Sequence, residues 1–178
     1  MDRILALEVA GTDVDALFVR LFRDYHGDIH AYLCRLTGDV QLAEDLAQDT
    51  FVKAYRALGR LPASANRRAW LYRIATNTAL DHLRRRRLIS WLPLFEDDRH
   101  PAADTSFQDA SLESVAVQRT LARLVPRYRV PLLLFACQGL STAEIARVLR
   151  ISPGAVKTRL FRAREKFRRL YAPEEGDG

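Results

Sequence analysis

The chain has 178 residues and a net charge of +6, and 48% of its residues are hydrophobic. This length allows one ordinary domain or two small ones, and no apolar run approaches the roughly 20 residues that a membrane-spanning helix needs. The amino-terminal apolar patch is too short and too acidic for a secretory signal. The composition therefore predicts a cytoplasmic protein that does not insert into a membrane.

The sequence contains no arrangement of residues that predicts catalysis or metal binding. Its two cysteines, Cys34 and Cys137, lie far apart in apolar helical patterns, which indicates buried free thiols in a reducing compartment. There is no CxxC or Cys/His cluster, no glycine-rich phosphate loop and no nucleophile elbow. The nearest carboxylate group indicates a charged helix face: Asp39, Glu44, Asp45 and Asp49. We therefore expect no enzyme, no metal, no cofactor and no small-molecule substrate.

The first half of the chain predicts three long helices. Apolar residues recur at helical spacing over three ranges: 14–36, 40–58 and 67–87. Gly38 lies near the end of the first helix, and Asp39 is a candidate N-cap for the second. Within the second helix, Tyr55 falls on the apolar stripe, so we expect it to be buried.

Residues 88–112 lose the helical pattern. They contain prolines, small residues and an acidic run at 96–98, which is the composition of a linker. The segment 89–95, with the sequence ISWLPLF, is more apolar than a solvated linker requires. It either docks on a partner or packs on its own domain, and the sequence leaves both interpretations open.

Helices resume after the linker, at about 112–124 and 126–138, and two further helices follow with clear start signals. Ser141 opens the sequence S-T-A-E, a capping box in which Glu144 reaches back to the serine. Ser152, followed by a proline, is a second N-cap with proline at the first helical position.

The last helix has one apolar side and is otherwise strongly basic. Its inward residues recur at helical spacing: Val156, Leu160, Ala163, Phe167 and Leu170. Two helices joined by a tight turn, the second of them basic, are typical of a helix-turn-helix that sets its second helix in a DNA major groove. The alternative is an αα-hairpin with a solvated basic face. Arg150 lies in the turn, where a left-handed backbone favours glycine and another residue costs roughly 1 kcal/mol.

Charge is distributed unevenly along the chain. The net charge is +3 over residues 1–87, −4 over 88–112 and +7 over 113–178, and residues 84–87 are four consecutive arginines. Two basic blocks that flank an acidic connector indicate two separate contacts with a polyanion.

Three strings together resemble the extracytoplasmic-function subgroup of bacterial sigma-70-type sigma factors. They are AEDLAQDTFVKAYRAL at 43–58, RAWLYRIATNTALDHLRRRR at 68–87 and GLSTAEIARVLRISPGAVKTRLFRAREKFRRL at 139–170. The resemblance implies an all-α fold of two small helical domains joined by a flexible acidic linker. Sigma domain 2 would occupy residues 1–87, the linker 88–111 and sigma domain 4, with its helix-turn-helix, 112–178.

The resemblance also implies what each part contacts. In the family, the second helix of domain 2 docks on the β′ subunit of core RNA polymerase, while the third helix and the preceding loop melt the −10 promoter element. Domain 4 binds the −35 element and the flap of the β subunit. The residues implied for core-polymerase binding are Asp45, Gln48, Asp49 and Lys53. Those for the −10 element are Trp70, Arg73, Asn77, Arg84 and Arg85; those for the −35 element are Lys157, Thr158, Phe161 and Arg162, with Arg159 and Arg164 on phosphates.

Some of these assignments have plain structural alternatives. Trp70 is as well explained by a place in the core as by stacking on a base, and the charged face of the second helix is also compatible with simple solvation. The loop 59–66, with the sequence GRLPASAN, departs from the versions typical of the family, so the base that it would capture stays undetermined.

The function that the resemblance implies is promoter-specific transcription initiation, in a stress or envelope response and under an anti-sigma factor that could hold the protein at the membrane. Two other classes stay open on the residues alone. A free-standing DNA-binding regulator would use only the carboxy-terminal block, and an enzyme acting on nucleic acid would need a metal–carboxylate arrangement that the sequence lacks.

Overall fold

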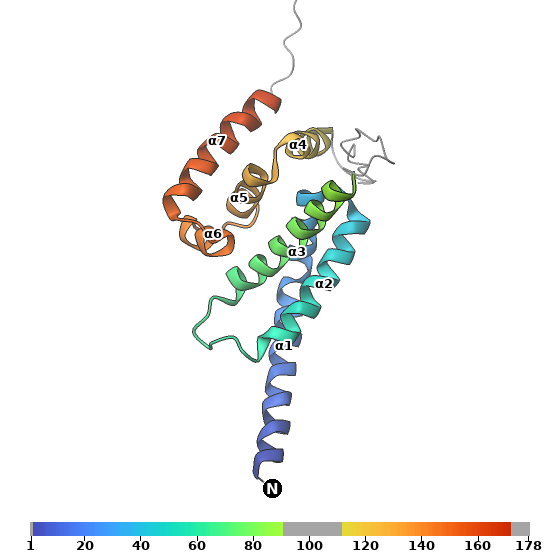
Figure 1. Ribbon diagram of the computed structural model, residues 1–178, viewed down its shortest axis with the longest axis vertical. Helices are drawn as coiled ribbons and strands as arrows, with labels where there is room; N and C mark the ends of the chain where they lie inside the picture. The colour runs from blue at the N-terminus through green and yellow to red at the C-terminus, as the bar shows by residue number, and fades with distance from the viewer. Residues whose placement is uncertain (1, 91–111, 172–178) are drawn as a thin grey trace, which may run out of the picture.

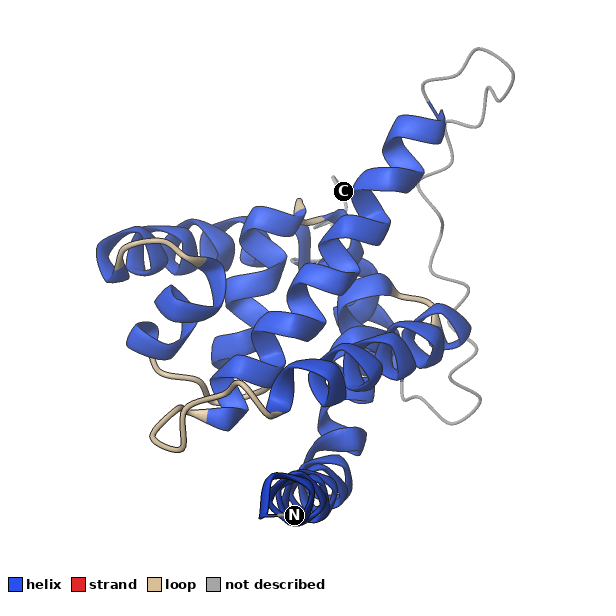
Figure 2. Cartoon of the chain, turned by 60° about the horizontal axis from the view of Figure 1, so that its bottom comes forward, coloured by secondary structure: helices blue, strands red, loops and turns tan. Residues whose placement is uncertain are grey.

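A computed structural model describes residues 2–90 and 112–171 of the chain. Those residues form seven helices: α1 (Asp2–Thr37), α2 (Val40–Leu58), α3 (Arg67–Ser90), α4 (Leu112–Arg123), α5 (Pro126–Ala136), α6 (Thr142–Leu149) and α7 (Pro153–Tyr171). Figure 2 shows helices and loops throughout this described part, with no strand in it. The all-α prediction is therefore confirmed, while most of the linker lies outside the described residues.

The helices form two groups that pack on each other. Helices α1, α2 and α3 lie side by side, and α4 to α7 gather against α1 and α3 (Figure 1). Side chains such as Leu33 and Leu71 in the first group and Ile145 and Val156 in the second are completely buried. Buried apolar residues of both groups belong to one continuous core.

Several helix boundaries were predictable from local signals. Asp39 caps α2 by accepting a hydrogen bond of 2.9 Å from the backbone N–H of Leu42, and Gly38 before it has a φ of 77°. Helix α1 begins at Asp2 rather than near residue 14. The strong helix formers of residues 4–7 account for the earlier start, because they outweigh the cost of about 1 kcal/mol for a glycine at position 11.

Two expectations about burial were wrong. Tyr55 is 47% exposed, because it lies at the edge of the apolar stripe and its hydroxyl donates a hydrogen bond of 2.8 Å to Asp15. Cys137 is exposed, whereas Cys34 is buried as expected. Cys137 is the C-cap residue of α5, where the helical pattern that suggested burial has ended.

The helix-turn-helix of α6 and α7 has the expected start signals. The Ser141 hydroxyl accepts from the Glu144 backbone N–H at 3.2 Å, and the Glu144 carboxylate accepts from the Ser141 N–H at 2.9 Å. Ser152 caps α7 by accepting a bond of 3.1 Å from the N–H of Ala155. Arg150 has φ 53° and ψ 47°, so the left-handed turn predicted at this residue is confirmed.

Replacing Arg150 by glycine is expected to stabilise the chain by about 0.5–1 kcal/mol, because glycine adopts the left-handed region without the Cβ clash. The measurement is the urea unfolding midpoint of the purified protein. Arg150→Ala removes the same charge but keeps the Cβ, so an equal stabilisation by both variants would contradict the backbone explanation.

Candidate nucleic-acid and protein interfaces

Helix α2 presents an acidic and polar surface. Asp45, Gln48 and Asp49 are all exposed on this helix, as the sequence predicted for a contact face. Lys53 is positioned differently, because its Nζ donates a hydrogen bond of 3.0 Å to the Thr78 hydroxyl on α3. All four predicted polymerase-binding residues are thus exposed, and Lys53 also bonds to a neighbouring helix.

An apolar rim beside this acidic surface was not predicted. Val52 and Tyr55 of α2 and Val19 and Phe22 of α1 are all more than one-third exposed. Beneath them, Phe51 packs edge-on against the ring of Phe22, with centroids 4.8 Å apart. Exposed apolar groups that border charged ones are typical of protein–protein contacts. Phe22 and Tyr55 belong to the apolar stripes that suggested burial, so periodicity alone could not identify them as exposed.

Helix α3 places its predicted DNA-binding residues at three depths. Asn77 is exposed, Arg73 is half-buried and Trp70 is only 9% exposed. In this conformation Trp70 belongs to the core, the alternative that the sequence left open. Of the arginine run, Arg84 and Arg85 are exposed, and Arg84 pairs with Asp81 at 3.2 Å.

Helix α7 exposes the residues that were predicted to contact the bases of the −35 element. Lys157, Thr158 and Phe161 are exposed, and Phe161 has 64% of its surface in solvent. An exposed phenylalanine next to a cation suits an apolar contact with a thymine methyl group in the major groove. No partner within the described part of the chain covers this ring, so the geometry favours a ligand at this face.

The remaining cations of α7 lie on its two flanks. Arg162 lies beside the Tyr128 hydroxyl of α5, and the hydrogen bond from Arg127, together with Arg162, lowers the pKa of Tyr128. On the other flank the Arg164 guanidinium lies 5.0 Å from the centre of the Phe135 ring. Arg159 is half-buried. Arg162 is itself exposed, so it lies on the solvent side of α7 with Lys157, Thr158 and Phe161, the residues with which the sequence grouped it.

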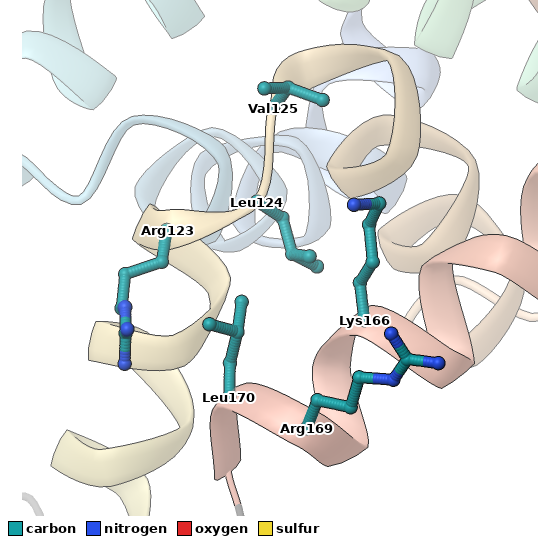
Figure 3. Close-up of a pocket in the computed structure, with 6 residues that line it drawn as sticks. All are labelled: Arg123, Leu124, Val125, Lys166, Arg169 and Leu170. Atoms are coloured by element: carbon teal, nitrogen blue, oxygen red, sulfur yellow. The ribbon is translucent and has the colours of Figure 1, made fainter.

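A basic groove lies between the α4–α5 turn and the carboxy-terminal end of α7 (Figure 3). Its volume is about 280 Å³, and its lining combines three cations with three apolar side chains: Arg123, Leu124, Val125, Lys166, Arg169 and Leu170. Leu124 and Leu170 point toward each other across the groove, while the cations stand around its edge. This combination suits an apolar segment with acidic flanks, and no pattern in the sequence predicted it.

The two helix groups are joined by hydrogen bonds from α3 to the segment around α6. The Tyr72 hydroxyl donates to Gln138 Oε1 at 2.5 Å, and Arg68 donates to the backbone carbonyl of Gln138. Asn66, which caps α3 by accepting from the Ala69 N–H at 2.9 Å, donates its Nδ2 hydrogen to Glu144 at 2.7 Å. Burial raises the pKa of Tyr72, so its hydroxyl keeps the proton that it donates.

A second set of bonds joins the end of α1 to the other group. Gln118 of α4 donates to the Arg35 carbonyl at 3.2 Å, and Arg129 of α5 donates to the Leu36 carbonyl at 2.7 Å. The last carbonyls of a helix have no partner within the helix, and here residues more than eighty positions away supply their donors. These contacts between the groups were not predicted, because nothing local in the sequence specifies them.

The capping carboxylate of Glu144 makes part of the stability dependent on pH. Hydrogen bonds from Ser141 hold the pKa of Glu144 below its ordinary value of 4.5. A lowered pKa contributes stability that is present above the ordinary pKa and is lost as the pH falls through the lowered one. Glu144→Gln keeps the capping geometry but does not titrate. We therefore expect the free energy of unfolding of the native chain to be higher than that of this variant by up to about 1 kcal/mol at pH 7.

Urea unfolding of both proteins between pH 7 and pH 3 measures this effect. The difference between them should shrink once the pH is below about 4.5. A difference that stayed constant over this range would show that the charge of Glu144 contributes nothing.

A metal site and a membrane-spanning helix are both absent from the residues that the structure describes. No three His, Cys, Asp or Glu side chains in that part of the chain lie close enough to hold a metal ion. Among its helices, none is both long and apolar enough to cross a membrane.

Comparison with known proteins identifies two family domains in the order that the helix groups follow. The family described as Sigma-70 region 2 matches residues 21–89, and the family described as Sigma-70, region 4 matches residues 114–167. The first match covers the second half of α1, all of α2 and nearly all of α3, and the second covers most of α4, all of α5 and α6 and most of α7.

Curated relatives match over nearly the whole chain. The ECF RNA polymerase sigma factor SigM of Mycobacterium tuberculosis is 38% identical over 168 residues, which cover 94% of this chain and 82% of the relative. The ECF RNA polymerase sigma factor SigW of Bacillus subtilis is 32% identical over 178 residues and covers 94% of both chains.

Two solved structures, each a complex with a second protein, are similar in fold. The sigma factor RpoE in complex with the anti-sigma factor NepR from Bartonella quintana matches with a TM-score of 0.71 and 26% identity, over 86% of this chain and 95% of that one. CnrH in complex with the cytosolic domain of CnrY matches with a TM-score of 0.66 and 31% identity, over 95% and 96%.

Proposed function

The chain belongs to the extracytoplasmic-function subgroup of sigma-70 factors, and from this premise we propose how its surfaces divide the work of promoter-specific initiation. Its partners are core RNA polymerase and promoter DNA. We propose that residues 1–87 act as sigma domain 2, residues 88–111 as the linker and residues 112–178 as sigma domain 4. The observation that carries the proposal is the outward set of Lys157, Thr158 and Phe161 on the helix-turn-helix of a chain whose first half matches region 2.

The exposed face of α2 is proposed to bind the β′ subunit. Asp45, Gln48 and Asp49 supply charge and hydrogen bonds, which give specificity and speed association. The neighbouring apolar rim, including Val52 and Tyr55, supplies area that is buried on binding. Lys53 contributes indirectly in this view, because its bond to Thr78 ties α2 to α3.

Helix α3 and the loop before it are proposed to act on the −10 element. Asn77 is exposed and suits a base edge, while the exposed Arg84 and Arg85 suit phosphates. Trp70 would stack on an unpaired base only after the surrounding side chains rearrange, since it is buried here. No bond is made or broken in this activity, so the protein is proposed to work through binding energy and not as an enzyme, with about 1–3 kcal/mol available for each stacked base.

Helix α7 is proposed to read the −35 element in the major groove. Lys157, Thr158 and Phe161 face the base edges, and Arg164 and Arg159 contact phosphates, which add affinity without sequence information. Arg162 is exposed with them and lies beside Tyr128, so it joins the same contact with the base edges.

The basic groove is proposed to bind the flap of the β subunit. Its apolar floor and cationic edge, seen in Figure 3, suit an apolar segment with acidic flanks. Lys166→Glu/Arg169→Glu should weaken binding to an isolated β-flap fragment about tenfold, the factor that corresponds to about 1.4 kcal/mol. Arg147→Glu/Arg150→Glu makes the same charge change on exposed positions of α6 and its C-cap. Equal weakening by both pairs, measured by fluorescence anisotropy, would contradict a groove-specific contact.

An anti-sigma factor is proposed as the regulator, in a stress or envelope response. The support is the fold match to the sigma factor RpoE, which was solved in complex with the anti-sigma factor NepR. We place the active protein in the cytoplasm, where core polymerase and promoters are found, and an anti-sigma partner in the membrane would hold the inactive protein there.

Run-off transcription tests the proposed function. Core bacterial polymerase is incubated with a pool of promoter-sized DNA fragments, with and without this protein. Discrete transcripts that require the protein establish its promoter. Sequence-specific DNA binding by the protein alone, with no dependent transcripts, would favour the free-standing regulator instead.

A further inference from the structure

The basic groove beside α7 combines three clustered cations with an exposed apolar floor. No carboxylate in the described part of the chain forms an ion pair with these cations, which are Arg123, Lys166 and Arg169. All three are exposed, and Val125 on the floor is 46% exposed. Like charges around an apolar surface repel one another. A segment that combines large apolar side chains with carboxylates would therefore stabilise this part of the molecule.

One segment of the linker has the chemistry that suits this groove. Residues 91–98 have the sequence WLPLFEDD and lie outside the described residues. The first part of the segment carries four large apolar side chains, from one tryptophan, one phenylalanine and two leucines. Three consecutive carboxylates follow at 96–98, equal in number to the cations of the groove and opposite in charge. The segment is thus complementary to the groove in both charge and apolar character.

Two other acidic segments lack the apolar part. Residues 104–109, with the sequence DTSFQD, contain two aspartates but a single large apolar side chain, Phe107. Residues 172–178, with the sequence APEEGDG, contain three acidic residues and no apolar side chain larger than that of proline. Exposed ion pairs alone contribute little to binding, whereas burial of leucine and phenylalanine contributes much more. Residues 91–98 are therefore the better occupant.

The groove lies close to the ends of α1 and α3. These helices run in the same direction in Figure 1, and the hydroxyls of Tyr32 and Thr76 are 2.9 Å apart. At 1.5 Å per residue from this pair, α3 ends about 15 Å beyond the level of Leu36. Arg129 donates hydrogen bonds to the carbonyls of both Leu36 and Leu124. Because Leu124 lines the groove, the groove begins beside the end of α1.

The linker is long enough on both sides of the segment. The five residues that follow Ser90 span up to about 17 Å when extended, which covers the axial distance of about 15 Å between the ends of α3 and α1. On the other side, residues 99–111 span up to about 45 Å. Helix α4 places only about 17 Å between Leu112 and Arg123 at the groove. Both connections therefore allow Phe95 and the carboxylates after it to reach the groove.

We propose that residues 91–98 dock in the basic groove of the free chain, with Leu94 and Phe95 on its apolar floor and the carboxylates of 96–98 at its cationic edge. Of the two interpretations that the sequence left open, the segment then packs on the chain itself. The docking does not depend on the proposed function. Its consequence does, because the flap of the β subunit is proposed to bind the same groove and would compete with the linker.

Tethering makes weak docking sufficient. A segment on a short flexible linker has an effective concentration on the order of 1 mM. An intrinsic Kd of about 0.1 mM would then fill the groove in about nine chains of ten. A competitor that needs the remaining free tenth binds about tenfold more weakly than it would bind an open groove.

Photo-cross-linking of the full-length chain tests the docking directly. Phe95→p-benzoylphenylalanine carries a benzophenone that reacts with nearby C–H bonds under ultraviolet light, and Phe107→p-benzoylphenylalanine is the matched control in the same linker. We expect monomers of the first variant, and not of the second, to cross-link to peptides that contain Val125 or Leu170. Mass spectrometry of the digested monomer identifies the peptides.

Charge reversal in the groove should weaken this cross-link. Lys166→Glu/Arg169→Glu is expected to reduce its yield about twofold, since a tenfold weaker contact lowers the docked fraction from about nine tenths to about a half. Arg147→Glu/Arg150→Glu makes the same charge change on α6 and its C-cap and should leave the yield unchanged.

Competition with the flap gives a second readout. Asp97→Lys/Asp98→Lys removes two of the carboxylates and should free the groove, so the isolated β-flap fragment should bind up to about tenfold more tightly. Asp104→Lys/Asp109→Lys makes the same charge change in the same linker and should leave the affinity unchanged. Fluorescence anisotropy of the labelled fragment measures both.

The outcomes separate the docking from the proposed function. The docking is overturned if position 95 does not cross-link to the groove, if position 107 does so equally, or if the cross-link forms only in dimers, which would assign the groove to a second copy. No gain in flap affinity from Asp97→Lys/Asp98→Lys, or the same gain from both linker variants, also overturns it. A chain that cross-links as expected but does not bind the flap fragment supports the docking and contradicts the flap assignment.

Discussion

Asp45→Arg/Asp49→Arg is expected to reduce the affinity of the chain for core RNA polymerase at least about a hundredfold. Both carboxylates are exposed one turn apart on α2. Their replacement therefore puts two cations at positions where we propose that two anions contact the polymerase. Removing one side of a close interfacial charge pair costs about 2–5 kcal/mol, and each 1.4 kcal/mol is a factor of ten. Fluorescence anisotropy of the labelled chain titrated with core polymerase measures the change.

The matched control is Asp24→Arg/Asp28→Arg. These two aspartates are also exposed and four residues apart, on α1, so the change in net charge is identical. If the control lost as much affinity, the loss would reflect long-range charge and the assignment of the α2 face would be wrong. Because the charge reversals lie on solvent-exposed positions, circular dichroism should detect no loss of helix in either protein.

Lys157→Ala/Phe161→Ala is expected to remove most discrimination between the −35 duplex and a scrambled duplex. A good base-edge contact contributes about 1–3 kcal/mol of discrimination, so losing two should lower specific affinity about 30-fold or more. We expect Phe161 to contribute more to this discrimination than Lys157, because its ring is 64% exposed without an apolar partner among the described residues.

Arg164→Ala provides the contrast for this second experiment. We expect a phosphate contact from Arg164, so its loss should weaken binding to promoter and scrambled duplexes alike. Competition binding at two salt concentrations distinguishes the two patterns. Equal weakening of both duplexes by Lys157→Ala/Phe161→Ala would place that pair on the backbone and not on the bases.

Features that depend on neighbours in sequence were predictable. The N-cap Asp39, the Ser141–Glu144 capping box and the left-handed Arg150 are each specified by a few adjacent residues, and each is present. The outward position of Lys157 and Phe161 followed from helical periodicity in the same way. Local chemistry therefore identified the helices and the exposed face of α7 that we propose reads the −35 element.

Features that depend on distant residues were not predictable. Periodicity placed Tyr55 on the inner stripe, but only the course of α1 determines that its edge is exposed. The burial of Tyr72 depends on Gln138, 66 residues further along the chain. Similarly, Lys53 faces Thr78 because α3 happens to lie beside α2. The basic groove forms from residues of the α4–α5 turn and the end of α7, so no single stretch of sequence contains it.

The caps that α4 and α5 supply to the end of α1 also have a consequence for folding. Gln118 and Arg129 bond to carbonyls 83 and 93 residues earlier in the chain, which makes them contacts of very long range. Closing such loops is slow, so α1 to α3 should form during synthesis before the residues that complete the end of α1 exist. Once both helix groups are present, each stabilises the other. The folded chain should therefore unfold in one cooperative transition, although it contains two family domains.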